Sequence, residues 1–130
     1  MKDLFNSIKT IAVVGLSDKP DRPSYVVADY LKRHGFKIIP VNPTIESTLG
    51  EKSYPSLDKI PEPIDVVDVF RQPQYVDEVM DAAIKIGAKV VWLQEGIVNQ
   101  KAAQKGRAAG LTVVMDKCMR KEHKKLFKGS

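Results

Sequence analysis

The segment that follows the first apolar run of the chain carries residue types that bind phosphate groups. Residues 15–23 (GLSDKPDRP) separate the β-branched run at residues 11–14 from a helical pattern that starts near Ser24. Backbone N–H groups and the positive end of a helix dipole favour an anion at such a loop. Lys19 and Arg22 add side-chain charge at the same place. The loop is therefore predicted to hold the phosphates of a nucleotide-like ligand.

Polar or reactive residues also follow each of the later apolar runs. Parallel strands bring their carboxyl ends to one edge of a sheet, and ligands bind there at the point where the strand order reverses. We therefore expect these residues to meet the first loop at one edge. They are Asn42 and Pro43, Phe70 to Pro73, Gln94 to Gly96, and Asp116 to Cys118.

The apolar runs that position these residues are short and rich in β-branched side chains, which is typical of strands covered on both faces. The strands are predicted at residues 11–14, 36–41, 64–70, 89–93 and 111–115. Mostly helical segments separate them, and such crossovers give parallel neighbours with helices on both faces. The predicted fold class is α/β, a Rossmann-like doubly wound sheet of five parallel strands.

Helix signals support this alternation of strands and helices. Ser24 is predicted to be the N-cap of the helix after the first loop, and Asn99 the N-cap of the helix after the fourth strand. Gly35, Gly87 and Gly110 mark helix ends. Helices are thus expected near residues 4–8, 24–35, 76–87, 99–110 and 119–127.

Three features of the predicted strands and connections are less regular. Pro40 cannot donate to a ladder, so it is expected at a strand end or at an unpaired position. Asp65 and Asp68 are expected at the mouth of the third strand or on a partly exposed edge. Residues 44–63 have room for one short helix near 56–60, and they either lie across a ligand pocket or form a surface crossover.

Composition limits the kind of protein. The length of 130 residues with 43% hydrophobic content predicts a single domain over residues 1–130, with Gly129 and Ser130 as a terminal linker. No apolar run approaches the ~20 residues of a membrane span. The first residues lack a secretory signal, and the single Cys gives no disulfide framework. We expect a cytoplasmic protein without a membrane partner.

The formal net charge is +5, and much of the excess lies in the basic C-terminal segment. A basic balance can indicate nucleic acid binding, but aromatic side chains other than Phe127 do not interleave this segment. A solvated helix face is the simpler interpretation. The positive field equally favours a small ligand rich in phosphate.

The usual dinucleotide fingerprint Gly-x-Gly-x-x-Gly is absent, because Ser17 and Pro20 stand at its second and third glycine positions. NAD binding also requires an acid after the second strand, where this chain has neutral Asn42. A Walker loop with Gly-Lys-Ser/Thr is missing as well. The phosphates of the ligand must therefore be bound in another manner.

The chain resembles the small single-domain CoA-binding proteins related to the CoA-binding domain of the succinyl-CoA synthetase α subunit. The residues that carry this resemblance span nearly the whole chain: VVGLSDKPDRPSY, IIPVNP, YPSLDKIPEPIDVVDVFRQP, VWLQEGIVN and VVMDKCMRKEH. It implies a Rossmann-like sheet that binds coenzyme A, or an acyl-CoA, with the ADP portion near the first loop.

The resemblance also implies positions for the ligand. The first loop contacts the phosphates, the turn after the second strand lies beside the adenosine, and an apolar side chain at the third strand end flanks the base or the pantetheine. The thiol end then points toward the end of the fourth strand and Cys118. The predicted binding residues are Gly15, Leu16, Ser17, Asp18, Lys19, Pro20, Arg22, Ser24, Val41, Asn42, Pro43, Phe70, Arg71, Gln94, Glu95 and Cys118.

Two departures from the synthetase bear on function. Its turn after the second strand supplies a Lys shortly after the Pro, whereas Thr44 follows here, so Arg22 or Arg71 would have to hold the 3′-phosphate. The resemblance does not extend to the synthetase domain that carries the phosphohistidine, so ligase activity is not expected from these residues alone. We expect a non-catalytic CoA-binding or sensor protein, with an acyl-CoA or NAD(P)-dependent enzyme as the alternative.

Reactive side chains leave further alternatives open. Cys118 is either a packed thiol or a group that forms a mixed disulfide with CoA. Glu95 is a candidate general base from its strand-end position, although the resemblance makes it a pocket residue. Neither His has the Cys or acid neighbours that zinc requires, so no metal site is assigned. No catalytic residue is assigned either. The sequence is compatible with a homo-oligomer or with a protein partner.

Overall fold

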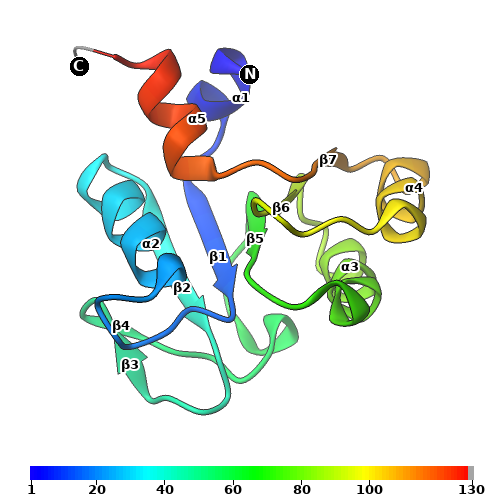
Figure 1. The fold of residues 1–130 in the computed structure, drawn as a ribbon. Coiled ribbons are helices and arrows are strands. Elements are labelled where there is room, and N and C mark those ends of the chain that lie inside the picture. Colours follow the sequence, from blue (N-terminus) through cyan, green and yellow to red (C-terminus); the bar gives the residue numbers. More distant parts are fainter. Residues whose placement is uncertain (129–130) are drawn as a thin grey trace.

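The computed structural model describes residues 1–128 and is organised around a parallel sheet (Figure 1). Its strands are β1 Thr10–Val14, β2 Lys37–Val41, β5 Val66–Val69, β6 Val90–Leu93 and β7 Thr112–Val114. They form a 5-stranded sheet in the order β2-β1-β5-β6-β7, and every neighbouring pair is parallel. The predicted fold class is confirmed. Gly129 and Ser130, the expected linker, lie outside the described residues.

Helices cover both faces of this sheet, as right-handed crossovers require. They are α1 Lys2–Ser7, α2 Pro23–Arg33, α3 Val76–Lys85, α4 Gln100–Ala108 and α5 Met119–Leu126. One core cluster contains Leu31 and Trp92 beneath α1, α2 and α5, and the other contains Met80 and Ala103 beneath α3 and α4. Because both faces are covered, β1, β5 and β6 are buried along their whole length. No helix within residues 1–128 is long and apolar enough to cross a membrane.

The order of the strands reverses at β1. The chain passes from β1 to the edge strand β2 and then returns to the other side of β1 to form β5. The carboxyl ends of β1 and β5 therefore flank the switch point, at the lower edge of the sheet in Figure 1. Ligands of doubly wound proteins bind at this point, which makes it the first place to look for a site.

Pro40 lies inside β2, and the edge position of that strand accommodates it. The backbones of Lys37 and Val41 bond toward β1, so the alternate residue Pro40 faces the open side of the sheet. On that side its carbonyl accepts a bond from the N–H of Tyr54 at 3.0 Å. The missing N–H removes no bond of the β1–β2 ladder, and the expectation of an unpaired position is confirmed.

The two acids of the third predicted strand do not lie where we expected them. Asp65 is at the amino end of β5, where its carboxylate accepts bonds from the N–H groups of Lys9 at 2.8 Å and Thr10 at 3.0 Å. Asp68 lies inside β5, between Val13 of β1 and Trp92 of β6, and is fully buried. Neither acid is at the ligand-side mouth, because the strand is shorter than predicted and both its faces are covered.

The connection between β2 and β5 forms a small hairpin and one helical turn. The hairpin pairs β3 Ser47–Thr48 with β4 Glu51–Lys52, and the 3₁₀ turn η1 spans Leu57–Lys59, within the predicted short helix. Thr44 and Leu57 line hollows at the carboxyl edge of the sheet. Of the two interpretations of this connection, the one that places it beside a pocket therefore agrees with the fold.

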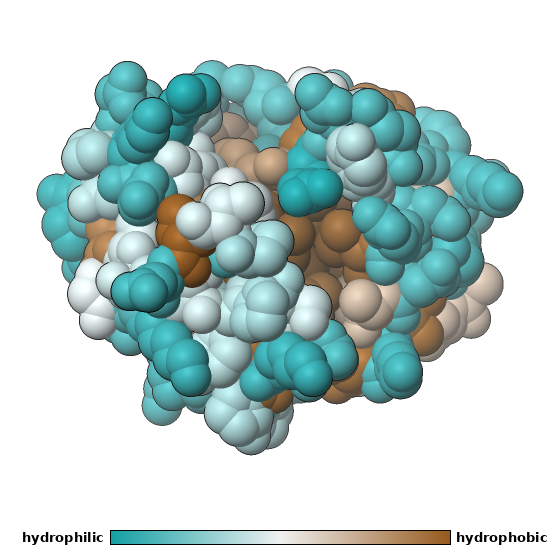
Figure 2. All heavy atoms as spheres, turned by 90° about the horizontal axis from the view of Figure 1, so that it is seen from below, coloured by the Kyte–Doolittle hydropathy of each residue, from teal (hydrophilic) through white to brown (hydrophobic). Residues whose placement is uncertain are grey.

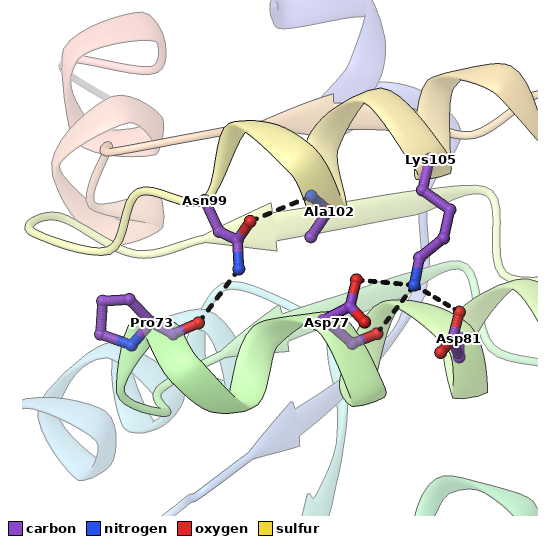
Figure 3. Close-up of polar contacts among 6 residues, drawn as sticks. All are labelled: Pro73, Asp77, Asp81, Asn99, Ala102 and Lys105. Atoms are coloured by element: carbon purple, nitrogen blue, oxygen red, sulfur yellow. Dashed lines mark hydrogen bonds and ion pairs between the residues drawn. The ribbon is translucent and has the colours of Figure 1, made fainter.

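The packing of α3 against α4 is fixed by side chains of both (Figure 3). Asn99 caps α4 as predicted, and its Nδ2 donates to the carbonyl of Pro73, in the 3₁₀ turn η2 Pro73–Tyr75, at 3.1 Å. Lys105 bridges the carboxylates of Asp77 and Asp81, each at 2.6 Å. These contacts hold α3 and α4 together, and α3 in turn borders a hollow at the carboxyl edge of the sheet.

Candidate functional site at the carboxyl edge

Three adjoining hollows lie along the carboxyl edge of the sheet, which Figure 2 views from below. The first-loop hollow, about 420 Å³, lies over residues 15–24 and 42–45. The apolar hollow, about 270 Å³, lies between β2, η1 and α3. The β6 hollow, about 540 Å³, lies beyond the ends of β5 and β6. Phe70 lines both the first-loop and β6 hollows, and Arg71 lines both the β6 and apolar hollows, so the three adjoin one another and are together called the groove below.

Gly15 directly follows β1 and lies against the ends of β2 and β5 at the switch point. Its φ is +88°, and a Cβ at this position would lie 2.5 Å from the carbonyl oxygen of Phe70. Its N–H donates to the carbonyl of Val41 at 2.9 Å, while Phe70 N–H donates to Val14 at the same distance. Both the left-handed backbone and the close approach require glycine. The first loop is therefore held directly against the ends of β2 and β5.

The prediction that Ser24 is the N-cap of α2 is wrong. The N-cap is Arg22, two residues earlier, and the helix begins at Pro23, whose fixed φ suits the first helical position. Ser24 is instead buried, and its hydroxyl accepts a bond from the N–H of Ser17 at 3.0 Å. Asn42 also holds the loop, since its Nδ2 donates to the carbonyl of Leu16 at 3.0 Å. Two predicted site residues thus act by shaping the loop.

The charged side chains of the loop favour an anion. Lys19 and Arg22 line the first-loop hollow, and within residues 1–128 neither forms an ion pair. Pro23 and Ser24 of the first turn of α2 line the same hollow, so the positive end of the helix dipole lies there, although Pro23 itself has no N–H to donate. Asp18 lines the hollow as well and opposes this field. The two cations and the helix end together outweigh that single carboxylate.

The apolar hollow is lined mainly by apolar side chains. Val41, Leu57 and Val79 line it, and Figure 2 shows apolar surface in a hollow bordered by hydrophilic side chains. Arg71 stands at its border, with the guanidinium carbon 4.7 Å from the ring centroid of Tyr75. The hollow therefore combines an apolar surface with two charged side chains, Arg71 and Glu78, as small-molecule pockets commonly do.

A buried polar pair lies beneath the β6 hollow. Gln94 lines the hollow, donates through Nε2 to Oδ1 of Asp68, and accepts the N–H of Met119 at 3.4 Å through Oε1. Its amide is thus fixed by both ends. Oδ2 of Asp68 has no hydrogen-bond partner within the described residues. Burial raises the pKa of Asp68 from 3.8 to about 7, and the bond from Gln94 acts in the opposite direction.

The remaining reactive groups of the β6 hollow are Glu95 and Cys118. Glu95 is exposed, and its carboxylate pairs with Lys121 of α5 at 2.9 Å. Cys118 is the N-cap residue of α5, partly buried, and packs against the core cluster while it also lines the hollow. These surroundings agree with a packed thiol, and the mixed disulfide of Cys118 with CoA stays a prediction.

All of the predicted site residues line one of the three hollows except Leu16 and Pro20. Leu16 is fully buried and contributes its carbonyl to the loop, while Pro20 is exposed outside the hollows. The sequence analysis missed Leu57 and Val79 as site residues. Each has an ordinary core pattern, and only the fold brings the connection and α3 to the end of β2. Contact with a ligand stays a prediction for every one of these residues.

Comparison with known proteins identifies a family model and relatives that match most of the chain. The model of the CoA binding domain matches residues 9–124. "Uncharacterized protein YneT" of Bacillus subtilis is 44% identical over 123 residues, which span 95% of this chain and 91% of that protein. The ADP-forming acetate–CoA ligase II of Archaeoglobus fulgidus is 36% identical over 91 residues, which span 68% of this chain and 13% of the ligase.

A solved structure supports the same relationship. The "hypothetical protein from Pyrococcus horikoshii OT3" superposes with a TM-score of 0.93 at 45% identity, and the match covers 96% of this chain and 88% of that one. The match to the family model extends from the residue before β1 into α5, and so includes every strand of the sheet. The chain therefore belongs to the family of CoA binding domains.

Proposed function

We propose that the protein binds coenzyme A, or a CoA thioester, along the carboxyl edge of the sheet. The observation that carries the proposal is the position of the cationic first loop at the switch point, at one end of a groove that continues to Cys118. The pyrophosphate would lie at the start of α2, against backbone N–H groups, Lys19 and Arg22. CoA carries several phosphate charges, which this loop would neutralise.

The other parts of the ligand have matching surroundings. The apolar hollow beside Val41 would hold the adenine, and Arg71 at its rim would take the 3′-phosphate, with Arg22 as the alternative. Asn42 carries no charge that would repel that phosphate. The pantetheine would pass Phe70 into the β6 hollow, and its thiol end would lie near Gln94 and Cys118.

A non-catalytic binding or sensor role is the better supported version of this function. Both ends of the Gln94 amide are occupied, and Glu95 is paired with Lys121. Asp68 is fully buried beneath the hollow and lines none of the three. These arrangements favour recognition of the thiol end over proton transfer to it. The alternative is an acyl-CoA or NAD(P)-dependent enzyme, and the binding test below compares the nicotinamide nucleotides with CoA.

Isothermal titration calorimetry of the full chain with CoA, acetyl-CoA, NAD and NADP tests the proposal. We expect CoA and acetyl-CoA to bind more tightly than either nicotinamide nucleotide. The double variant Lys19→Gln/Arg22→Gln should weaken CoA binding roughly 10- to 100-fold, because each lost cation removes a charge-assisted contact to phosphate. Lys85→Gln/Lys101→Gln, at two exposed positions outside the groove, is the control with the same change of charge.

The outcomes separate the alternatives. Tighter binding of NAD or NADP than of CoA would contradict the proposal and favour the enzyme. Equal weakening of CoA binding by both double variants would show that net charge, and not the first loop, determines affinity.

A further inference from the structure

A second pocket lies between α2 and α5, away from the groove. It has a volume of about 400 Å³. It lies at the carboxyl end of α2 and along the length of α5, from Arg120 in its first turn to Phe127, whereas the first loop meets α2 at its amino end. In Figure 1 α2 runs upward from the first loop, and its upper end lies near the start of α5. The residues of this basic pocket are Tyr30, Arg33, His34, Arg120, Lys124, Phe127 and Lys128.

The basic pocket has an unbalanced positive charge. Its lining contains four Arg and Lys side chains and no carboxylate. Within residues 1–128 the one ion pair formed by these cations joins Arg33 to Asp29 at 3.2 Å, on the exposed surface of α2. Arg120, Lys124 and Lys128 form none in that range. A bound anion would relieve the mutual repulsion of these side chains.

Compensation of the helix dipoles does not account for all of this charge. Cations in the last turn of a helix stabilise its negative end, and both α2 and α5 end here. Each helix end carries roughly half an elementary charge, so the two together amount to about one negative charge. Arg33 pairs with Asp29, but the other three cations of the lining form no ion pair within residues 1–128, and Arg120 lies in the first turn of α5, away from its negative end. The surplus is available to a ligand.

The aromatic residues of the basic pocket are already engaged. His34 stacks on Tyr30 with ring centroids 4.0 Å apart, and the Arg120 guanidinium carbon lies 5.6 Å from the same ring. His123 stacks on Phe127 at 4.5 Å, and the Lys2 ammonium lies 5.4 Å from that ring. These contacts stiffen the floor of the pocket and leave little ring surface for a stacked base. Charge, and not stacking, is what the pocket offers.

We propose that the basic pocket is a second anion site, which binds a compact oligophosphate, free or as the tail of a nucleotide. The volume of about 400 Å³ is within the ~300–1,000 Å³ of small-molecule pockets. Convergent Arg and Lys side chains match the several oxygens of adjacent phosphates. The site is separate from the groove at the carboxyl edge of the sheet, since the two share no lining residue.

Amide chemical-shift mapping of the full chain tests this site separately from the first loop. The chain is titrated with tripolyphosphate and, in a second arm, with ATP, at constant ionic strength. We expect saturable shifts at residues 30–34 and 120–128, in addition to any at residues 17–24. The same shifts with both ligands indicate that the phosphates alone are bound, and further shifts with ATP indicate that the nucleoside contributes.

Matched variants connect the shifts to the proposed cations. Arg120→Gln/Lys124→Gln should weaken the binding measured at residues 30–34 on the order of tenfold or more. Because Arg120 also contacts Tyr30, the exposed pair Arg33→Gln/Lys128→Gln serves as a second variant with the same expected direction. Lys85→Gln/Lys101→Gln should leave the affinity unchanged.

Three results would overturn the inference. Shifts confined to residues 17–24 would leave the first loop as the anion site in this experiment. Shifts that sodium chloride reproduces would reveal general screening. A polyglutamate peptide or an oligonucleotide that shifts residues 30–34 at lower concentration than tripolyphosphate would indicate a macromolecular partner instead.

Discussion

Asp68→Asn changes one buried atom and tests the electrostatics beneath the groove. Asn keeps the oxygen that accepts the bond from Gln94, but it cannot ionise. In the wild type the folded carboxyl has a pKa of about 7, against 3.8 without burial, so the folded state retains a proton that the unfolded state has lost. Between these two values the unfolded chain binds fewer protons, and the free energy of unfolding must fall as the pH rises.

The size of this effect follows from the two pKa values. They differ by about three pH units, and each unit corresponds to ~1.4 kcal/mol, so ionisation of Asp68 should cost about 4 kcal/mol once the pH is above 7. Full burial means that solvent does not screen this term. The amide NH₂ of Asn, placed at the unpartnered position of Oδ2, adds a penalty of ~1–3 kcal/mol that does not depend on pH.

Urea unfolding of the wild type and of Asp68→Asn at pH values from 4 to 9 measures the difference. The free energy of unfolding of the variant, relative to the wild type, should rise with pH by about 4 kcal/mol and level off above pH 7. Other titrating groups cancel in the comparison because both chains contain them. A difference that stays constant across this range would refute the argument.

Two further substitutions test the backbone and charge arrangements. Gly15→Ala should lower the free energy of unfolding by at least ~2 kcal/mol, because its Cβ would lie 2.5 Å from a carbonyl oxygen at a φ of +88°. Gly35→Ala, with a φ of +93° and open space around its Cβ, is the control, and an equal loss in both variants would exclude the contact. Asp65→Asn should cost ~1–3 kcal/mol at neutral pH. Partial burial raises the pKa of Asp65, but the N–H bonds from Thr10 and Lys9 and the Lys89 ammonium outweigh burial, so the net pKa is lowered. The stability that the carboxylate contributes is therefore present above pH 3.8 and is lost as the pH falls through the folded pKa. The difference in the free energy of unfolding between the wild type and Asp65→Asn should therefore become smaller in acid. A difference that stays the same at low pH would contradict the lowered pKa of Asp65.

Local sequence patterns were sufficient to predict the cationic first loop and most of the residues that line the groove. Gly15, Lys19 and Arg22 follow a β-branched run and precede a helix, and that order alone predicts an anion site. The strand-end rule likewise selected Gln94 and Cys118, which line the same groove. The N-cap of α2 was predicted two residues too late, because Ser suits an N-cap and Pro suits the first helical position, and the sequence does not decide which of Ser24 and Pro23 sets the start.

Non-local contacts account for what the sequence analysis missed. Asp68 looks like a strand-end acid in sequence, and only pairing with β1 and β6 on both sides makes it a buried carboxyl. Leu57 joins Val79 in the apolar hollow because η1 and α3 meet at the end of β2. The basic C-terminal segment becomes a pocket when α5 packs against the end of α2.

The sequence by itself determined the five strands of the main sheet, its parallel character, the α-helices and the cationic loop, but not the small β3–β4 hairpin. Side-chain periodicity, glycine positions and connection length act within a few residues, so a single chain segment displays them. Tertiary structure decided the order of the strands and hence the switch point at β1 and β5. Pairing partners are chosen by the burial of whole faces across long stretches of chain, and no local window contains that information.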